Sequence, residues 1–313
     1  MTDTGPLFVS SGDLIADRRY KWAIEEASRG DFAAAAEILV QTVALAPAFA
    51  TAWFALGAIR DRLGDASGAI AAFAKACDAD PDDYHGARLQ LARLGAGEAN
   101  PAMSEPYVRR LFDQYAGRYD AALTERLAYR GPALLRDAVD RAMQAAERPL
   151  RFSSMLDLGC GTGLGGDAFR PIVDRLVGVD LSPAMVAQAA AKSLYDRLVT
   201  ADIAKFLAEA AGAPAQYQLV LAADVFVYVN DLAPIVAAIA RVLAPDGLFA
   251  FTVETHSGDG VKLLPTLRYA HDAPYLRRAL ADAGLAPAAI TPAAVRSEKG
   301  VPVDSLVVVA QPA

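Results

Sequence analysis

The spacing of hydrophobic residues divides the chain into two parts. Through about residue 95, large apolar residues recur at intervals of three and four, and small residues, mostly alanine, stand where two helices would approach closely. After two further helical segments, at about 107–117 and 121–145, short apolar runs alternate with helical stretches. This pattern predicts an all-helical segment followed by alternating strands and helices.

The apolar runs of the second part have the length of β-strands. They lie at 154–159, 175–180, 197–202, 217–224, 247–254 and 305–310, and residues 288–298 add a seventh. Strands separated by helices form a mainly parallel, doubly wound sheet, so the predicted fold class is α/β with a Rossmann-like seven-stranded sheet. Ligands of such sheets lie at the carboxyl ends of the strands, so functional residues are expected in the loops after the first, second and fourth strands.

The helical first third repeats itself with a period of 34 residues. Pro47 and Pro81 differ by 34 positions, as do Gly30 and Gly64. A proline that ends one helix pair and a glycine that separates two helices are typical of a helix-turn-helix repeat. Each copy is therefore expected to contain two antiparallel helices.

The two copies, at about 16–49 and 50–83, resemble tetratricopeptide repeats, and a further helix is expected near 84–94. Two interpretations stay open: the repeats bind a peptide or partner protein in a groove, or they pack as a rigid appendage on the rest of the chain. The Gly-, Ala- and Pro-rich stretch 95–106 separates the parts. We expect a helical repeat domain over 1–100 and an α/β domain over 101–313.

Composition and charge exclude several classes of protein. The chain is 54% hydrophobic and 21% charged, so it can bury a sizeable core. A net charge of −7 argues against general binding to nucleic acid or to an anionic membrane. Two cysteines and three histidines without metal-ligand spacing predict no disulfide framework and no structural metal. The N-terminal residues lack the basic-then-apolar pattern of a signal peptide, so a cytoplasmic location is expected.

The loop after the first predicted strand combines an acid with closely spaced glycines. Asp157 is followed by Gly159, Gly161 and Gly163 before the next helix. Glycine lets the backbone turn sharply and lets a ligand lie against the main chain. The spacing also fits the dinucleotide pattern GxGxxG, but a carboxylate at the strand end repels a pyrophosphate and attracts an ammonium group. Asp157 therefore favours a ligand with a cationic amino-acid group.

The second and third predicted strands each end in an acid. The two carboxylate oxygens of Asp180 can accept hydrogen bonds from both hydroxyls of a ribose, and Asp180 can also cap the helix that starts near Ser182. Asp202, with the apolar Ile203 after it, suits the exocyclic amine and ring face of adenine. The alternative for Asp202 is an N-cap of the following helix.

Five motifs together, LDLGCGTG, GVDLSPAM, TADI, LVLAADVFVYV and RVLAPDGLFAFTVE, resemble the class I S-adenosylmethionine-dependent methyltransferases. The resemblance covers about residues 107–313 and is closest to the small-molecule branch that includes ubiquinone and menaquinone biosynthetic enzymes. The segment LFDQYAGRYDAAL is similar to the lid helix of that branch. With its repeats, the whole chain resembles a bacterial family of repeat-containing predicted methyltransferases.

The resemblance implies S-adenosylmethionine as cofactor and assigns its contacts. It places the methionyl part against Asp157, Gly159, Gly161, Gly163 and Tyr115, the ribose against Asp180 and Leu181, the adenine against Met185, Asp202 and Ile203, and the sulfonium beside Ala223 and Asp224. Relatives that methylate amino groups of nucleobases or glutamine carry an Asn-Pro-Pro-Tyr-type motif after the fourth strand. This chain has Ala222-Ala223-Asp224-Val225 there, so such substrates are not expected.

Methyl transfer depends on alignment and needs a base only when the acceptor arrives protonated. The candidate catalytic residues are Tyr119 in the lid, Asp224 after the fourth strand and His256 after the fifth. His256 can equally be a solvated loop histidine, and His271 is a second candidate or a feature of the next helix start. Arg268, Arg296 and Lys262 can bind an acidic substrate group or be surface charges.

These observations predict an enzyme that methylates oxygen, nitrogen or carbon of a small metabolite, acidic metabolites included. Two alternatives remain. One is a protein methyltransferase whose repeats recruit the target, and the other is a repeat-based adaptor whose cofactor-binding domain acts as a sensor. A small-molecule substrate and a protein partner at the repeats are the expected partners, without nucleic acid or membrane.

Overall fold

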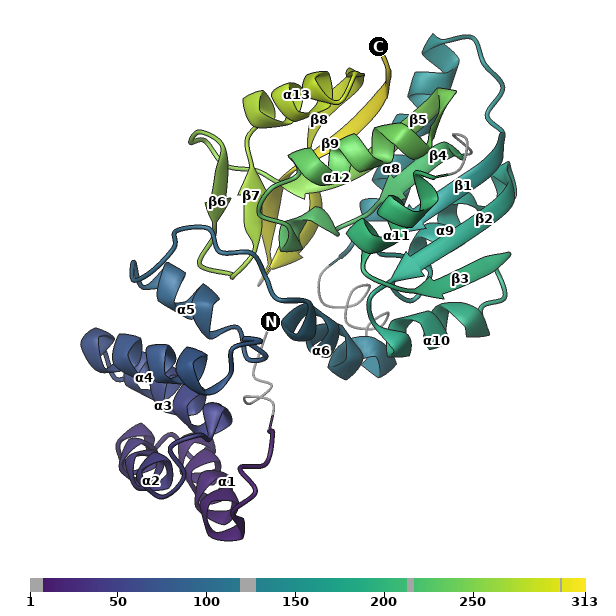
Figure 1. Cartoon of the computed structure of the whole chain (residues 1–313). Helices are drawn as coiled ribbons and strands as arrows, with labels where there is room; N and C mark the ends of the chain where they lie inside the picture. The colour runs from purple at the N-terminus through teal and green to yellow at the C-terminus, as the bar shows by residue number, and fades with distance from the viewer. Residues whose placement is uncertain (1–7, 119–127, 213–216, 299) are drawn as a thin grey trace. The chain divides into compact units, whose positions relative to one another are not determined.

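The computed structural model describes residues 8–118, 128–212, 217–298 and 300–313. The chain divides into two compact units, the first formed mainly by residues up to Tyr107 and the second by the chain from Val108 onward. Figure 1 colours the chain from its N-terminus to its C-terminus and labels the elements of both units. Each unit has its own hydrophobic core.

The first unit consists of paired helices. These are α1 (Leu14–Ser28), α2 (Phe32–Leu45), α3 (Ala50–Arg62), α4 (Ala66–Ala79) and the shorter α5 (Ala87–Arg93). The 34-residue period appears in the turns: Gly30 and Gly64 have φ of 88° and 79°, a left-handed conformation that favours glycine. The residue after each glycine, Asp31 or Asp65, accepts a backbone N–H in the first turn of the next helix. The turn between the two helices is therefore built the same way in both copies.

Small residues let the helices of the second repeat approach closely. A Cβ atom on Gly57 would lie 2.7 Å from the ring of Phe73, so the missing side chain in α3 makes room for an aromatic ring from α4. Phe73 is 1% exposed and packs edge to face against Phe54. This contact accounts for the glycine inside a helix, where it would otherwise be unfavourable.

The second unit is built on one mixed sheet. Its strands are β1 (Phe152–Leu158), β2 (Val173–Asp180), β3 (Arg197–Thr200), β4 (Tyr217–Ala222), β5 (Leu243–Glu254), β6 (Val261–Leu263), β7 (Tyr269–His271), β8 (Leu285–Glu298) and β9 (Val301–Pro312). The order is β3-β2-β1-β4-β5-β7-β6, with β9 also antiparallel to β5 and β8 antiparallel to β9. The five strands β3, β2, β1, β4 and β5 are parallel, so their carboxyl ends lie at one edge.

Helices cover both faces of this sheet (Figure 1). One core cluster joins the sheet to α11 (Ile203–Ala210), α12 (Ala233–Val242) and α13 (Ala273–Asp282), and a second joins it to α8 (Gly131–Ala145) and α9 (Leu164–Phe169). The remaining helical segments are α6 (Glu105–Tyr115), α10 (Pro183–Ala191) and the 3-10 turns η1 (Ala116–Arg118), η3 (Arg170–Ile172) and η4 (Phe226–Tyr228). The strand order reverses between β1 and β4, which is where ligands bind in doubly wound sheets.

The predicted helical and strand regions are confirmed in outline, with differences at particular segments. Within the described residues the sheet has nine strands rather than seven, because the short β6 and β7 form an additional hairpin. Their runs of three residues are too short to give a recognisable alternation. The second predicted helix of 121–145 starts at Gly131, after Ala128 with a φ of 46°, and residues 119–127 lie outside the described part.

We expect Phe73→Ala to destabilise the first unit by about 3–5 kcal/mol, because it removes a buried aromatic ring and leaves a cavity beside Gly57. The chain has two tryptophans, Trp22 and Trp53, and both lie in this unit. Tryptophan fluorescence during urea titration therefore reports its unfolding selectively. Leu45→Ala is the matched control, since Leu45 is 44% exposed, and it should change the unfolding free energy by less than about 0.5 kcal/mol.

Candidate active site

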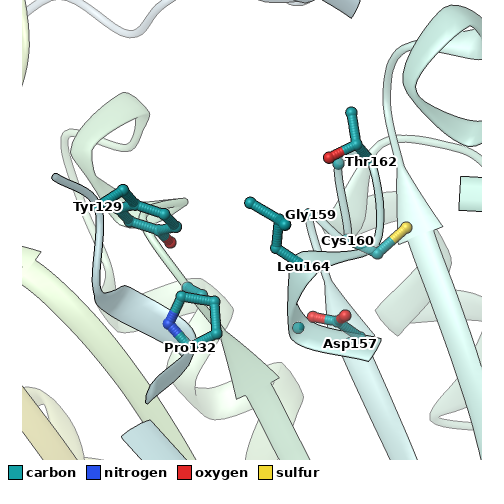
Figure 2. A pocket seen from close by; sticks show the side chains of 10 residues that line it. Tyr129, Pro132, Asp157, Gly159, Cys160, Thr162 and Leu164 are labelled. Atoms are coloured by element: carbon teal, nitrogen blue, oxygen red, sulfur yellow. The ribbon is translucent and has the colours of Figure 1, made fainter. Parts of the chain in front are cut away.

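A pocket lies at the carboxyl ends of β1 and β4, where the strand order reverses. It encloses about 330 Å³, including space open to solvent, and is lined by Tyr129, Pro132, Asp157, Gly159, Cys160, Gly161, Thr162, Leu164, Gly165 and Ala223. Figure 2 shows Tyr129 and Pro132 on one side and the glycine-rich loop on the other, with the Leu164 side chain directed across the opening and the Cys160 thiol turned away. The predicted residues Asp157, Gly159, Gly161 and Ala223 thus share one pocket.

The Asp157 carboxylate is the main ionisable group of this pocket. Asp157 is the penultimate residue of the central strand β1 and is 2% exposed. Burial raises the pKa of Asp157 to about 7, and the neighbouring charge of Asp180 adds to the rise. Oδ2 of Asp157 accepts a hydrogen bond of 2.6 Å from the hydroxyl of Tyr195, which lowers the pKa again. A buried carboxylate of this kind gains most from a cationic partner.

The glycines of the loop make room for particular side chains. A Cβ on Gly165 would lie 2.6 Å from Oδ2 of Asp157, and one on Gly159 would lie 2.5 Å from the side chain of Val225. By contrast, a Cβ on Gly161 would meet no atom within 4 Å, and its φ is 53°. Gly159 also has a positive φ, of 64°, so its backbone conformation and its packing both favour glycine. Gly161 is favoured by its backbone conformation alone, and Gly165 by packing alone.

Asp180 holds the loops after β1 and β2 together. Its Oδ2 accepts the N–H of Gly161 at 2.8 Å, and its Oδ1 accepts the N–H of Ser182 at 2.9 Å. Ser182 in turn caps α10, with Oγ accepting the N–H of Met185 at 3.1 Å. Burial raises the pKa of Asp180. Each carboxylate oxygen keeps a second acceptor position, so these contacts are compatible with the predicted ribose role.

The residues predicted to contact an adenine also have structural roles. Oδ1 of Asp202 accepts the N–H groups of Ala204 and Lys205, both at 3.0 Å, and therefore caps α11. Ile203 is partly buried against the core below the sheet edge, and Met185 is fully buried on α10. Asp202 therefore acts as a helix cap through Oδ1, while Oδ2 takes no part in the cap.

The predicted lid helix contacts the strand-end loops of the second unit. Asp113 on α6 accepts a hydrogen bond of 2.5 Å from Ser182 Oγ, and Nε of Arg109 donates to the carbonyl of Leu181 at 3.4 Å. Phe112 packs edge to face on Tyr228, with ring centroids 5.1 Å apart. This half of α6 therefore lies against the loops after β2 and β4, and it carries the partly buried Tyr115.

Tyr119, the lid residue predicted as catalytic, lies outside the described residues. Asp224, which the sequence also predicts to be catalytic, is the second residue after β4 and follows the pocket residue Ala223. Asp224 adopts a left-handed φ of 59°, which costs a non-glycine residue roughly 1 kcal/mol. Its backbone N–H donates to Thr252 Oγ1 at 2.9 Å, which holds the residue in this conformation. The strain is consistent with a functional position.

A cluster of buried charges surrounds Asp224 at the ends of β4, β5 and β8. It consists of Asp224, Glu254, Glu298, Arg268 and Arg296, and we call it the charged cluster. Arg296 is 1% exposed and pairs with Asp224 at 2.6 Å, with Glu298 at 3.4 Å and with Glu254. Arg268 pairs with Glu254 at 3.4 Å and Glu298 at 3.2 Å. Three carboxylates thus share two guanidinium groups.

The two arginines of the charged cluster are paired within the chain. The sequence predicts Arg268 and Arg296 as candidates for binding an acidic substrate group, but their guanidinium groups form ion pairs with carboxylates of the same chain. With all five groups ionised, the cluster carries one surplus negative charge. Burial raises the pKa of Asp224 to about 6 and that of Glu254 to about 7. The two arginines therefore give no support to an acidic acceptor.

The two candidate histidines both have structural partners. His256 Nδ1 accepts the N–H of Gly258 at 3.0 Å, and Nε2 donates to the carbonyl of Gly260 at 3.1 Å. Both ring nitrogens are thus used within its own loop, an arrangement that does not favour a general base. His271 is fully buried in β7, and Nε2 donates to the carbonyl of Val229 at 3.0 Å. Burial lowers the pKa of His271 to about 4, so its ring is neutral near pH 7.

Two pocket residues and one residue behind the pocket carried no sequence signal. Tyr129 and Pro132 reach the pocket from the start of α8, and Tyr195 reaches Asp157 from the segment before β3. A proline in the first turn marks a helix start in the sequence, but nothing local shows that this helix end faces the glycine-rich loop. The Tyr195–Asp157 contact spans 38 positions and depends on the packing of β2 against β1 and β3.

Comparison with known proteins agrees with this architecture. Residues 156–251 match the methyltransferase domain family, and residues 20–84 match the tetratricopeptide repeat family. Human methyltransferase-like protein 27 is 38% identical over 104 residues, which is 33% of this chain and 40% of that protein. The matched part is thus less than half of the human relative.

Two solved structures share the fold of the second unit. Magnesium protoporphyrin IX methyltransferase from Synechocystis PCC 6803, with bound S-adenosylhomocysteine, is 18% identical, with a TM-score of 0.50 over 67% of this chain and 99% of that chain. The 1,6-didemethyltoxoflavin-N1-methyltransferase of Burkholderia thailandensis is 20% identical, with a TM-score of 0.51 over 69% and 93% of the two chains. Part of the chain thus matches tetratricopeptide repeats, another part matches a methyltransferase domain, and the second unit has the Rossmann-like fold of these two solved methyltransferases.

Among the described residues, no helix combines the length and the apolar character that crossing a membrane requires. Nor does the described part of the chain bring together three or more His, Cys, Asp or Glu side chains in an arrangement that could hold a metal ion.

We expect Asp157→Asn to stabilise the ligand-free protein at alkaline pH. The pKa of Asp157 is raised from 3.8 to about 7, so its contribution is most favourable below pH 4 and is lost as the pH rises through 7. Asparagine lacks the buried charge and can still accept from Tyr195. At pH 8 the variant should be more stable by roughly 2–4 kcal/mol, and at pH 4 about equal, as measured by urea unfolding of the second unit. A difference that is independent of pH would contradict the assigned titration.

Proposed function

We propose that this protein transfers a methyl group from S-adenosylmethionine to oxygen, nitrogen or carbon of a small molecule. The observation that carries the proposal is the buried, acceptor-only Asp157 carboxylate in the pocket at the sheet's reversal point, with Asp180 beside it. The methyltransferase family match and the shared fold support it. When bound, the cofactor supplies a methyl group that is activated by a sulfonium charge.

The residues of the pocket fit such a cofactor. Asp157 would accept hydrogen bonds from its ammonium group, because both charges are neutralised when they meet in a buried site. Asp180 would accept from ribose hydroxyls through its remaining lone pairs, and the partly buried Ile203 would offer an apolar contact for the adenine. The residues proposed for cofactor binding are Asp157, Gly159, Gly161, Gly163, Asp180, Leu181, Met185, Asp202, Ile203, Ala223 and Tyr115.

Asp224 is the proton acceptor that we propose for acceptors arriving protonated. It follows the pocket residue Ala223, and it belongs to a cluster with one more carboxylate than guanidinium groups. One proton can therefore be held by the charged cluster near neutral pH without separating unlike charges. His256 is the weaker proposal, since both of its ring nitrogens are occupied. Tyr119 stays a candidate from the sequence.

We expect the full chain to bind S-adenosylhomocysteine in isothermal titration calorimetry and Asp180→Ala to weaken that binding at least about thirtyfold. The variant would lose the two charge-assisted hydrogen bonds proposed between Asp180 and the ribose hydroxyls. The Gly161 and Ser182 N–H groups would also lose their acceptor. Asp174→Ala is the control, because Asp174 lies on the same strand but is exposed at its other end. Tight binding of NADH in place of S-adenosylhomocysteine would refute the cofactor assignment.

A second experiment tests the acceptor class. The full chain is incubated with methyl-labelled S-adenosylmethionine and a cell extract that has been separated into small molecules and proteins. Label should enter the small-molecule fraction, and Asp224→Asn should lower that transfer at least about tenfold while changing affinity for S-adenosylhomocysteine less than threefold. Asp246→Asn, which alters an exposed acid near the start of β5, the end of the strand away from the pocket, serves as control. Label that enters only protein would favour a protein methyltransferase with recruiting repeats.

A further inference from the structure

We propose that Tyr195 is a positioning residue that holds the Asp157 carboxylate ionised and aimed at the ammonium group of the cofactor. The inference rests on the proposed cofactor site and adds to it a residue that lies in none of the methyltransferase motifs. Tyr195 precedes β3 and approaches the glycine-rich loop from the side. It does not line the pocket, so it acts through Asp157.

The packing around Tyr195 shows that a tyrosine-shaped space is built into the loop. A Cβ on Gly166 or on Gly178 would lie 2.8 Å from the Tyr195 ring, and one on Gly163 would lie 3.2 Å from it. Gly166 belongs to α9 and Gly163 is the N-cap of that helix, whereas Gly178 belongs to β2. Three glycines from two elements therefore admit one ring, and any side chain at Gly166 or Gly178 would displace it.

The hydrogen bonds of the hydroxyl define its role. The Gly166 N–H donates to the Tyr195 oxygen at 3.1 Å, so the oxygen is already an acceptor toward the helix start. Its single proton is donated to Asp157 Oδ2 at 2.6 Å. Because the phenol donates to the carboxylate, it favours the ionised form of Asp157 and leaves Oδ1 outside this bond. The backbone of α9 thereby fixes the direction of the carboxylate through one hydroxyl.

Other charged groups near Asp157 act against ionisation. Asp180 raises the pKa of Asp157, and the Cys160 thiol, whose own pKa is raised by burial and by both carboxylates, supplies no positive charge. The hydrogen bond from Tyr195 lowers the pKa of Asp157 and so opposes the effects of burial and of the Asp180 charge. Removing its hydroxyl should therefore leave Asp157 protonated over a wider pH range.

The test compares Tyr195→Phe with the wild-type full chain in calorimetric titrations with S-adenosylhomocysteine from pH 6 to 8.5. For the wild type, affinity should fall as the pH drops through about 7, because Asp157 takes up a proton. In Tyr195→Phe, affinity at pH 7 should be about tenfold lower, and the fall should begin at a higher pH, so that the two curves approach each other at pH 8.5. The ammonium group of the ligand titrates equally in both experiments.

Tyr217→Phe is the matched control. Tyr217 is a buried tyrosine of the same unit at the start of β4, the end of the strand away from the pocket. Its substitution should leave the affinity and its pH dependence unchanged. If Tyr195 served packing alone, Tyr195→Phe would lower affinity by the same factor at every pH, or not at all, and either result would overturn the proposal.

A ligand-free measurement separates this inference from the proposed function. The unfolding free energies of Tyr195→Phe and of the double variant Tyr195→Phe/Asp157→Asn are compared over pH, as are those of wild type and Asp157→Asn. In each pair the difference should start to grow near pH 4, and the pH at which it stops growing should be higher in the Tyr195→Phe background. Identical ranges would overturn the role of Tyr195 even if the cofactor binds. Failure of wild type to bind S-adenosylhomocysteine, with shifted ranges, would overturn the proposed function and leave the Tyr195–Asp157 coupling established.

Discussion

The carboxylate buried at the end of the central strand determines which residues can surround it. Asp157 lies between β2 and β4, and burying its charge is unfavourable unless hydrogen bonds or a cation compensate. Among the residues that the structure describes, compensation comes from the hydroxyl of Tyr195. Gly165 provides the space for the carboxylate, and the ring of Tyr195 needs the space left by Gly166 and Gly178. The remaining deficit is the physical reason why a cationic ligand is favoured here.

The parallel sheet gathers further acids at the same edge. Asp180 ends β2, Asp224 follows β4 and Glu254 ends β5, so neighbouring strands deliver carboxylates to one side of the molecule. Those near the glycine-rich loop bind backbone N–H groups, whereas those beyond β4 pair with Arg268 and Arg296. The edge therefore has one part suited to an amino-acid and ribose group and another with a surplus of negative charge. Under the proposed function, we expect a neutral or positive acceptor to fit this second part better than an anion.

The helical repeats are stabilised on different principles. Their core is formed by alanines and by glycine-aromatic contacts such as Gly57 with Phe73, and the same turn is built twice at an interval of 34 residues. Few charges are buried there. The repeat core is thus held mainly by apolar packing, whereas the second unit concentrates strained and charged groups at one sheet edge.

Local sequence was sufficient for the features that depend on neighbours in the chain. The 34-residue period, the strand-helix alternation and the acids at strand ends follow from backbone hydrogen bonding and side-chain periodicity, which a sequence displays directly. Tertiary structure alone decided that Tyr195 meets Asp157, that Arg296 meets Asp224 across 72 positions, and that His256 is used by its own loop. Pairings of this kind depend on the order of strands in the sheet and on which ring fits beside which glycine. These pairs of residues come within contact distance only when the sheet has formed.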